Sequence, residues 1–185
     1  PDGSKAEGQA VLLHACCAPC SAAIVECMLR NGMKPTVYFS NSNIYPQQEY
    51  DVRKHELKRF LEAQNVPYEE DEYDHHEWLS VIKGLEDEPE RGSRCSVCFQ
   101  FRLSHAAKYA QEHGFHLLTT TLASSRWKNI RQIDTAGYLA VEAYPDVEWW
   151  DMNWRKGGLQ NRRGELLRIN EFYNQLYCGC EFSMR

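Results

Sequence analysis

The sequence predicts an α/β protein in which helices cover both faces of a parallel sheet. Short apolar segments rich in β-branched and aromatic residues recur along the chain. Each of these is followed by a longer segment in which apolar residues repeat with helical spacing. Alternation of this kind is typical of strands joined by crossover helices, which place the strands in parallel.

Five strands are expected. The run VLLH at 11–14 is continuously apolar, as in a strand buried on both faces. TVYF at 36–39 combines β-branched and aromatic residues. A short third strand is expected near 67–68, a fourth over LLTTTL at 117–122, and a fifth over VEWW at 147–150.

Helices are expected between these strands and after the last one. The segment 21–30 is amphipathic and ends at Asn31–Gly32, residues that tolerate the left-handed conformation of a helix end. The segment 49–64 places apolar residues on one helical face among charges. The remaining helices are expected over 75–85, 95–112, 130–143 and 163–173.

Composition and length indicate one globular domain. The chain has 185 residues, of which 43% are hydrophobic and 25% charged, and it lacks the run of about 18 apolar residues that a membrane span needs. Residues 1–10 have no apolar h-region, so we interpret them as a disordered leader or cloning remnant, not as a secretory signal. Residues 11–185 are then a single α/β metal-binding catalytic domain, which we expect to be cytoplasmic.

Seven of the eight cysteines are bunched in three short stretches. Metal binding explains this better than disulfides, because bridges between such close neighbours are strained and no export signal is apparent. Thiol redox chemistry without a metal is the alternative. The eighth, Cys27, follows the apolar stripe of its helix and is expected to be a buried core thiol. The bunched cysteines are Cys16, Cys17, Cys20, Cys95, Cys98, Cys178 and Cys180.

The number of thiols favours iron–sulfur over zinc. Cys17–Cys20 and Cys95–Cys98 are CxxC pairs, a spacing that serves zinc and iron–sulfur clusters alike. A structural zinc ion is saturated by four ligands, which would leave three cysteines unexplained. A 4Fe–4S cluster also takes four, and the remaining three can hold a second metal or act as a redox dithiol.

These groups are expected to meet at one edge of the sheet. Ligands of open α/β sheets bind outside the carboxyl ends of the strands. Cys16 follows the first strand directly, the loop 41–46 follows the second, and Ser124 follows the fourth. Tyr45 and Glu49, in and just after that loop, are candidate proton donors, with a packing role as the alternative.

Charge is unevenly distributed along the chain. The net charge of −5 argues against a protein that binds nucleic acid over its whole surface, and residues 49–90 hold 14 acids but only 5 bases. The later part of the chain interleaves bases with tryptophans, a pattern suited to phosphate contacts and base stacking, although a solvated helix face explains it equally well. The candidate RNA-binding residues are Arg126, Trp127, Lys128, Trp154, Arg155 and Lys156.

Six motifs occur along the chain: HACCAPC (14–20), NSNIYPQQEY (41–50), RCSVC (94–98), TTTLASS (119–125), NWRKGG (153–158) and YCGCEFS (177–183). In this order they resemble the motifs of the QueH family of cobalamin-independent epoxyqueuosine reductases, and the match covers nearly all of the chain from Val11. The resemblance implies a fold related to the adenine-nucleotide α-hydrolase (HUP-like) domains. It also implies reduction of epoxyqueuosine to queuosine in the anticodon loop of tRNA, with an electron-donor protein or reductant as partner.

The resemblance further implies a 4Fe–4S cluster beside a second, mononuclear iron. Some members have Asp where this chain has Cys20, so the cluster here is expected to be held by cysteines alone. The division we favour puts Cys17, Cys20, Cys95 and Cys98 on the cluster and Cys16, Cys178 and Cys180 on the other iron.

Two other functions are weighed against this one. The first is a zinc-stabilised tRNA-binding module without catalysis. The second is a thiol–disulfide or sulfur-transfer enzyme of the ATP-pyrophosphatase type, which CCAPC disfavours because it replaces the glycine-rich phosphate loop such enzymes carry.

Overall fold

The computed structural model describes residues 8–184. Most of the expected leader, residues 1–7, lies outside the described residues, whereas Ala10 already belongs to the first strand. The strands are β1 (Ala10–Ala15), β2 (Lys34–Phe39), β3 (Tyr68–Glu70), β4 (Leu117–Thr120) and β5 (Glu148–Trp149). The helices are α1 (Ala18–Arg30), α2 (Gln47–Ala63), α3 (His75–Val81), α4 (Ser93–Glu112), α5 (Ile130–Val141) and α6 (Leu159–Ile169), and the 3-10 turns are η2 (Thr121–Ser124) and η3 (Glu181–Ser183).

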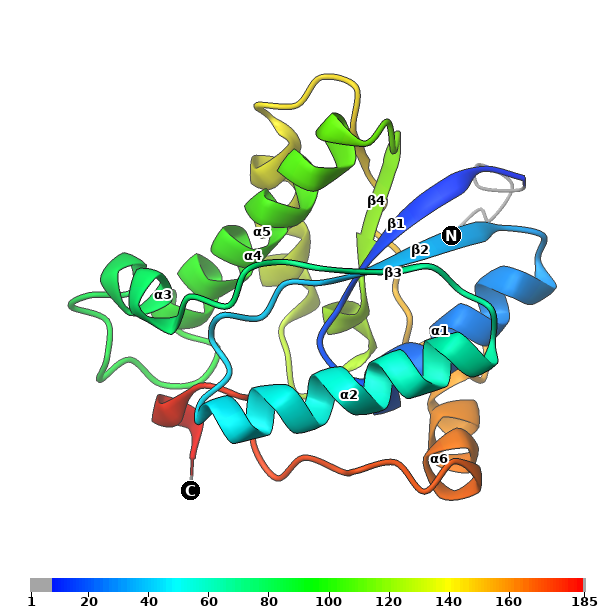
Figure 1. The fold of residues 1–185 in the computed structure, drawn as a ribbon. Coiled ribbons are helices and arrows are strands. Elements are labelled where there is room, and N and C mark those ends of the chain that lie inside the picture. The colour runs from blue at the N-terminus through cyan, green and yellow to red at the C-terminus, as the bar shows by residue number, and fades with distance from the viewer. Residues whose placement is uncertain (1–7, 185) are drawn as a thin grey trace.

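The five strands form one parallel sheet in the order β3-β2-β1-β4-β5 (Figure 1), which confirms the predicted fold class. The central strand β1 pairs with β2 on one side and with β4 on the other, so that Leu13 lies between Val37 and Thr119. The chain therefore adds strands in both directions from β1. The gap between the carboxyl ends of β1 and β4 is the switch point where α/β sheets bind ligands.

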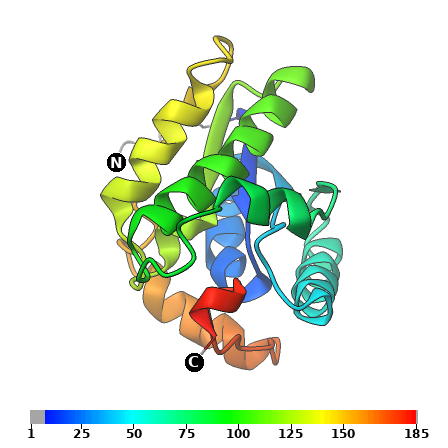
Figure 2. The same cartoon turned by 90° about the vertical axis from the view of Figure 1, so that its left-hand side faces the viewer.

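Two apolar cores lie on opposite faces of the sheet. Alternate residues of β1 point to opposite faces, so Leu13 packs with α1 and α2, whereas Leu12 packs with α4 and α5. Helix α6 packs on the outer side of α1, and Leu166 joins the same core. Figures 1 and 2 show the resulting layers, with α4 and α5 on one side of the strands and α1, α2 and α6 on the other.

Several element boundaries differ from the sequence prediction. Helix α1 begins three residues earlier because its first turn accepts Pro19, whose missing N–H has no partner to lose there. Helix α3 ends at Val81 instead of continuing to 85, and Gly84 follows in the left-handed conformation. Helix α6 lies at Leu159–Ile169 and not at 163–173, because the chain enters it through the left-handed Gly158. The fourth strand stops at Thr120, where η2 replaces its expected end.

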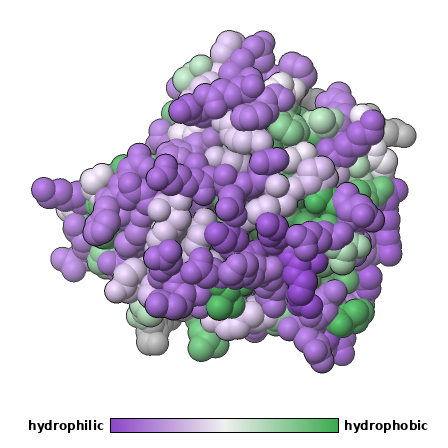
Figure 3. All heavy atoms as spheres, in the orientation of Figure 1, coloured by the Kyte–Doolittle hydropathy of each residue, from purple (hydrophilic) through white to green (hydrophobic). Residues whose placement is uncertain are grey.

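Hydrophilic residues dominate the surface seen in Figure 3, with apolar residues confined to small patches. None of the helices in residues 8–184 combines the length and apolar character that a membrane crossing requires.

Candidate metal centre

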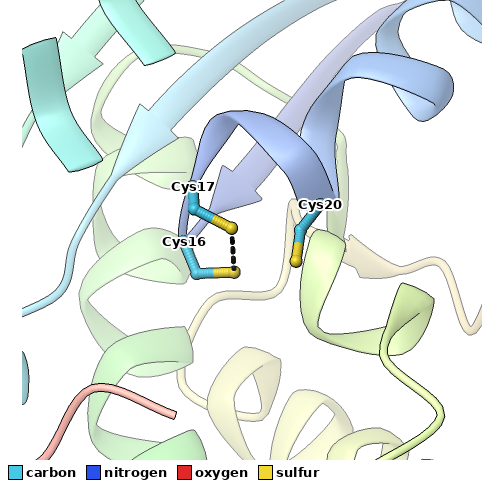
Figure 4. Close-up of side chains that lie close together, drawn as sticks. All are labelled: Cys16, Cys17 and Cys20. Atoms are coloured by element: carbon cyan, nitrogen blue, oxygen red, sulfur yellow. Dashed lines mark hydrogen bonds between the residues drawn. The ribbon is translucent and has the colours of Figure 1, made fainter. Parts of the chain in front are cut away.

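Three thiols meet at the carboxyl end of β1. Cys16 and Cys17 follow the strand directly, and Cys20 lies in the first turn of α1. Their sulfur atoms all lie within 4.8 Å of one another and point toward a common space (Figure 4), and the Sγ atoms of Cys16 and Cys17 are 3.8 Å apart. All eight cysteines are free thiols, so no disulfide supports the reading of this chain as a disulfide protein. We call Cys16, Cys17 and Cys20 the triad; its geometry suits chelation of one metal centre.

Local structure fixes the triad. Cys17 has an extended backbone that ends the strand and precedes α1, and the hydroxyl of Ser21 donates to the Cys17 carbonyl at 2.7 Å. The backbone N–H of Cys16 donates to Thr121 Oγ1 at 3.3 Å, across the switch point between β1 and β4. The triad therefore sits where the fold class predicts a ligand.

The three thiols differ in how readily they ionise. The pKa of Cys16 is lowered well below its usual value, chiefly by hydrogen bonds from Cys17 and then Cys20, with Arg102 and Lys128 contributing. The pKa of Cys17 is raised, chiefly by Cys16, and that of Cys20 is raised to about 11, again chiefly by Cys16. Cys16 is therefore the member of the triad that ionises most readily, and a bound cation would favour the thiolate form of all three.

Four further thiols gather between α4 and the segment that follows α6. Cys95 and Cys98 lie in the first two turns of α4, and Cys98 packs with Cys180 against Trp78. Burial is the main cause that raises the pKa of Cys95 and Cys98, to about 11 in the case of Cys98, and Cys178 and Cys180 raise both further. These four, Cys95, Cys98, Cys178 and Cys180, are the second thiol group.

Lys128 links the two groups. Its ammonium donates to Cys178 Sγ at 3.3 Å. Burial alone would lower the pKa of Lys128, but the thiols of Cys178, Cys16 and Cys20 together raise it well above its usual value. Lys128 therefore lies between the triad and Cys178 of the second thiol group, and a single site that includes all seven cysteines stays a prediction.

N–H donors point at several of these sulfur atoms. Gln175 Nε2 donates to Cys17 Sγ at 3.1 Å, and the backbone N–H of Arg91 donates to Cys95 Sγ at 3.3 Å. The indole N–H of Trp78 is buried without a partner at hydrogen-bonding distance among the described residues, yet it lies close enough to Cys98 to lower the pKa of that thiol. Donors of this kind stabilise thiolates over thiols, and hydrogen bonds to sulfur are a feature of iron–sulfur sites.

The segment carrying Cys178 and Cys180 is tied down by contacts to distant residues. Residues 170–184 run beneath α2 and return toward its N-terminal end (Figures 1 and 2), and we call them the C-terminal strap. Arg53 of α2 donates to the carbonyls of Cys178 at 3.0 Å and Tyr177 at 3.2 Å, and its guanidinium also lies over the Tyr177 ring. Tyr45 N donates to the Gly179 carbonyl at 2.9 Å. The position of the CxC motif therefore depends on α2 and on the loop after β2.

Comparison with known proteins places this arrangement in a family. The model of a family described as "Epoxyqueuosine reductase QueH" matches residues 11–185.

The chain belongs to the QueH family.

Proteins named epoxyqueuosine reductase QueH are similar to it over nearly its whole length, and the family is one of oxidoreductases. The protein of Histophilus somni is 48% identical over 95% of this chain and 72% of its own length. That of Haemophilus influenzae is 46% identical over 100% of this chain and 74% of its own length, and that of Thermotoga maritima is 32% identical over 94% and 90%. A relation to HUP-like domains, which the QueH resemblance implies, stays a prediction.

The residues predicted as proton donors of a QueH enzyme lie beside the strap. Tyr45 is exposed, and its ring stacks on His75 at a centroid distance of 5.2 Å. Glu49 is engaged at both carboxylate oxygens, accepting from Arg53 at 2.7 Å and from the Tyr173 hydroxyl at 2.8 Å. In this arrangement Glu49 braces the strap.

Two other sequence assignments concern single residues. His14 is fully buried; Nε2 donates to the Ser40 carbonyl, so Nδ1 accepts from Thr120, and burial lowers the pKa of His14 to about 3. His14 is therefore a neutral core histidine. Cys27 is only partly buried, which departs from the expected core thiol.

The predicted RNA-binding residues fall into two sets. Trp127 is 71% exposed, and Arg126 and Lys156 are also exposed. Trp154 is only 3% exposed, because its ring packs against Trp150 and its Nε1 donates to Thr119. Its assignment as a stacking residue is therefore wrong for this structure.

The two remaining members of the basic segment are engaged within the protein. Lys128 faces Cys178, and Arg155 Nη2 donates to the Lys128 carbonyl at 2.7 Å. Both residues are half-buried.

Sequence reasoning missed Arg53, Gln175 and Trp78. Arg53 lies among charges that read as a solvated helix face, although it is 2% exposed. Gln175 and Trp78 carry no motif of their own. The one usable signal is the position of Arg53 four residues after Glu49, a spacing that pairs the two on a helix.

Proposed function

We propose that this chain is an epoxyqueuosine reductase that acts on tRNA and reduces the epoxide of epoxyqueuosine to the alkene of queuosine. The reaction consumes two electrons and two protons and releases the epoxide oxygen as water. The observation that carries the proposal is the meeting of the three triad thiols at the switch edge of a QueH-family chain, with Lys128 linking the second thiol group to them.

The seven cysteines would hold a 4Fe–4S cluster and a second, mononuclear iron. The donor set fits such groups, because N–H donors and the cations Lys128 and Arg102 stabilise thiolates there. When bound, such groups supply single electrons and a Lewis-acid site for an oxygen atom.

Two divisions of the ligands are open to test. The sequence favours Cys17, Cys20, Cys95 and Cys98 on the cluster. The spatial grouping instead supports a division into the triad and the second thiol group. Cys180→Ser separates them: under the first division the protein keeps its cluster absorbance and loses one iron, and under the second it loses the cluster.

The other roles follow from position. Tyr45 is exposed beside the strap and is our first candidate for the proton donor. Glu49 is the second, and it would give up its hydrogen bond from the Tyr173 hydroxyl in order to reach the substrate. Arg126, Trp127 and Lys156 offer cations and a ring to the tRNA. A low-potential electron donor, a protein or a small reductant, completes the reaction.

The test is anaerobic purification followed by measurement of iron, zinc and acid-labile sulfide per chain. Turnover is then measured on tRNA containing epoxyqueuosine by nucleoside analysis. We expect the wild-type protein to contain iron and sulfide and to form queuosine. The Cys98→Ser variant should lose the iron and sulfide of the cluster and should form no queuosine. About one zinc per chain with neither sulfide nor turnover would instead identify a zinc-stabilised tRNA-binding module.

A further inference from the structure

A hollow opens beside the triad, between the turn after β4 and the start of α6. Its volume is about 340 Å³, at the lower end of the range for small-molecule pockets and enough for one nucleotide. Arg163 connects it to the metal centre, since its charge acts on the thiol of Cys20. The lining residues are Ser124, Ser125, Arg126, Trp127, Gln160, Asn161, Arg163 and Gly164.

The lining offers donors and positive charge to an anion. Arg126 and Arg163 both line it, and within residues 8–184 no side chain caps the first turn of α6. The backbone N–H groups of Leu159 and Arg162 donate to carbonyls of residues 156 and 158, which leaves those of Gln160 and Asn161 for a ligand. Ser124 is 3% exposed, and its hydroxyl oxygen has no hydrogen-bond partner within residues 8–184. An unpaired buried hydroxyl is unfavourable, so a ligand that pairs with it is favoured.

Gly164 keeps the hollow open. It lies inside α6, where glycine is less favourable than alanine. No packing demand explains it, because a Cβ added at Gly164 meets no atom within 4 Å. The residue lines the hollow, so any larger side chain there would occupy the space of a ligand.

A ring stands at the rim of the same hollow. Trp127 is 71% exposed, and the Arg126 guanidinium lies 6.0 Å from its ring centroid. An exposed indole beside a cation is the arrangement that stacks an unpaired base and holds its phosphate.

We propose that this hollow is a subsite for one nucleotide of the RNA strand that flanks the modified base. Arg126 and Arg163 hold its phosphate, together with the Ser124 hydroxyl and the first turn of α6. Trp127 stacks on its base. The inference rests on the proposed function only in taking tRNA as the source of the nucleotide.

The test measures binding, not turnover. A fluorescein-labelled anticodon stem-loop RNA without epoxyqueuosine is titrated with the anaerobically prepared holoprotein at several salt concentrations, and the iron content and thermal midpoint are checked for each variant. We expect Gly164→Leu and Trp127→Ala each to weaken binding about 10-fold. Arg163→Gln should weaken it about 5-fold and reduce the salt slope by about one.

Matched controls lie in the same helix. Gly164→Ala adds one methyl group and should change binding less than Gly164→Leu, and Arg168→Gln removes an exposed charge from the far end of α6 and should leave binding unchanged. Wild-type affinity in folded, iron-loaded Gly164→Leu and Arg163→Gln would overturn the subsite. So would micromolar binding of AMP or GMP that leaves RNA binding intact, since the occupant would then be a free nucleotide. If wild type binds the RNA through these residues but does not reduce epoxyqueuosine, the proposed function fails and the subsite stands.

Discussion

The triad and the CxC motif of the C-terminal strap reach the same edge of the sheet by different means. The three residues of the triad lie within a stretch of five, 16–20, and their placement depends mostly on the bend from β1 into α1 and on a hydrogen bond from the neighbouring Ser21. The CxC lies in a segment whose only regular element is the short η3, and its backbone is held by Arg53, more than 120 residues earlier. Metal ligands can thus be placed by local sequence or by a distant clamp, and mutations should separate the two.

The largest expected effect comes from the triad itself. Cys20→Ser should lower turnover by more than about 100-fold and remove bound iron, since residues that only orient a metal ligand are already worth 10–100-fold. Cys27→Ser makes the same change in the same helix, away from the triad, and should keep iron and turnover near wild type. Equal loss in both variants would mean that the substitution disturbs α1 and not a ligand.

Arg53→Ala should be the next most damaging change, because it releases the strap. It leaves the Glu49 carboxylate, whose side chain is 11% exposed, without its cation, and breaking a buried pair costs about 3–5 kcal/mol. Chemical denaturation should report this loss, and limited proteolysis should cut within 170–184 first. Arg30→Ala removes the exposed arginine of an ion pair in α1 and should cost less than about 1 kcal/mol. Protease resistance of the strap in Arg53→Ala would contradict the clamp.

Gly179 tests the fit of the strap at a single atom. Its φ is +142°, and an added Cβ would lie 3.1–3.3 Å from Asn43, Ile44 and Arg53. Gly179→Ala should therefore cost about 1–3 kcal/mol and weaken retention of iron. Gly84→Ala is the matched control, because Gly84 also has a positive φ but open space around it, so its cost should be about 1 kcal/mol from the backbone alone. Equal costs would show that backbone strain, not contact, decides the result.

The smallest effect should come from the far end of the strap. His75 Nε2 lies 2.7 Å from Glu181 Oε2, and its Nδ1 lies 2.7 Å from the Ser42 carbonyl. His75→Ala should lower the free energy of unfolding by about 1 kcal/mol and leave the triad intact. The exposed His55 of α2 offers the control, and His55→Ala should change nothing measurable. A loss of triad-bound metal in His75→Ala would show that the triad and the strap form one cooperative unit.

The sheet and the triad could be predicted from the sequence, whereas the strap could not. The alternation of apolar and amphipathic segments was enough for the parallel sheet, and HACCAPC after an apolar run was enough to place the triad at the carboxyl end of β1. The strap was not accessible, since Arg53 looks like any arginine of a charged helix until its partners 124 and 125 residues away are known. Trp154 was assigned to RNA binding because a tryptophan next to two basic residues is typical of a binding surface. Its packing against Trp150, which the sequence does not reveal, buries it instead. The start of α6 depended on the left-handed Gly158, which sequence periodicity does not reveal.

The position of the strap in the sequence also sets the order in which the clustered thiols are synthesised. Chains are synthesised from the N-terminus at roughly 5–20 residues per second, so the triad emerges about 8 to 30 s before Cys178 and Cys180 exist. During that interval the strap does not yet cover the three thiols of the triad, and neither Gln175 nor the CxC thiols are present beside them. If these thiols hold the proposed metal groups, the complete ligand set exists only once residues 170–184 are in place, and the full set of metals is bound only after that segment has closed.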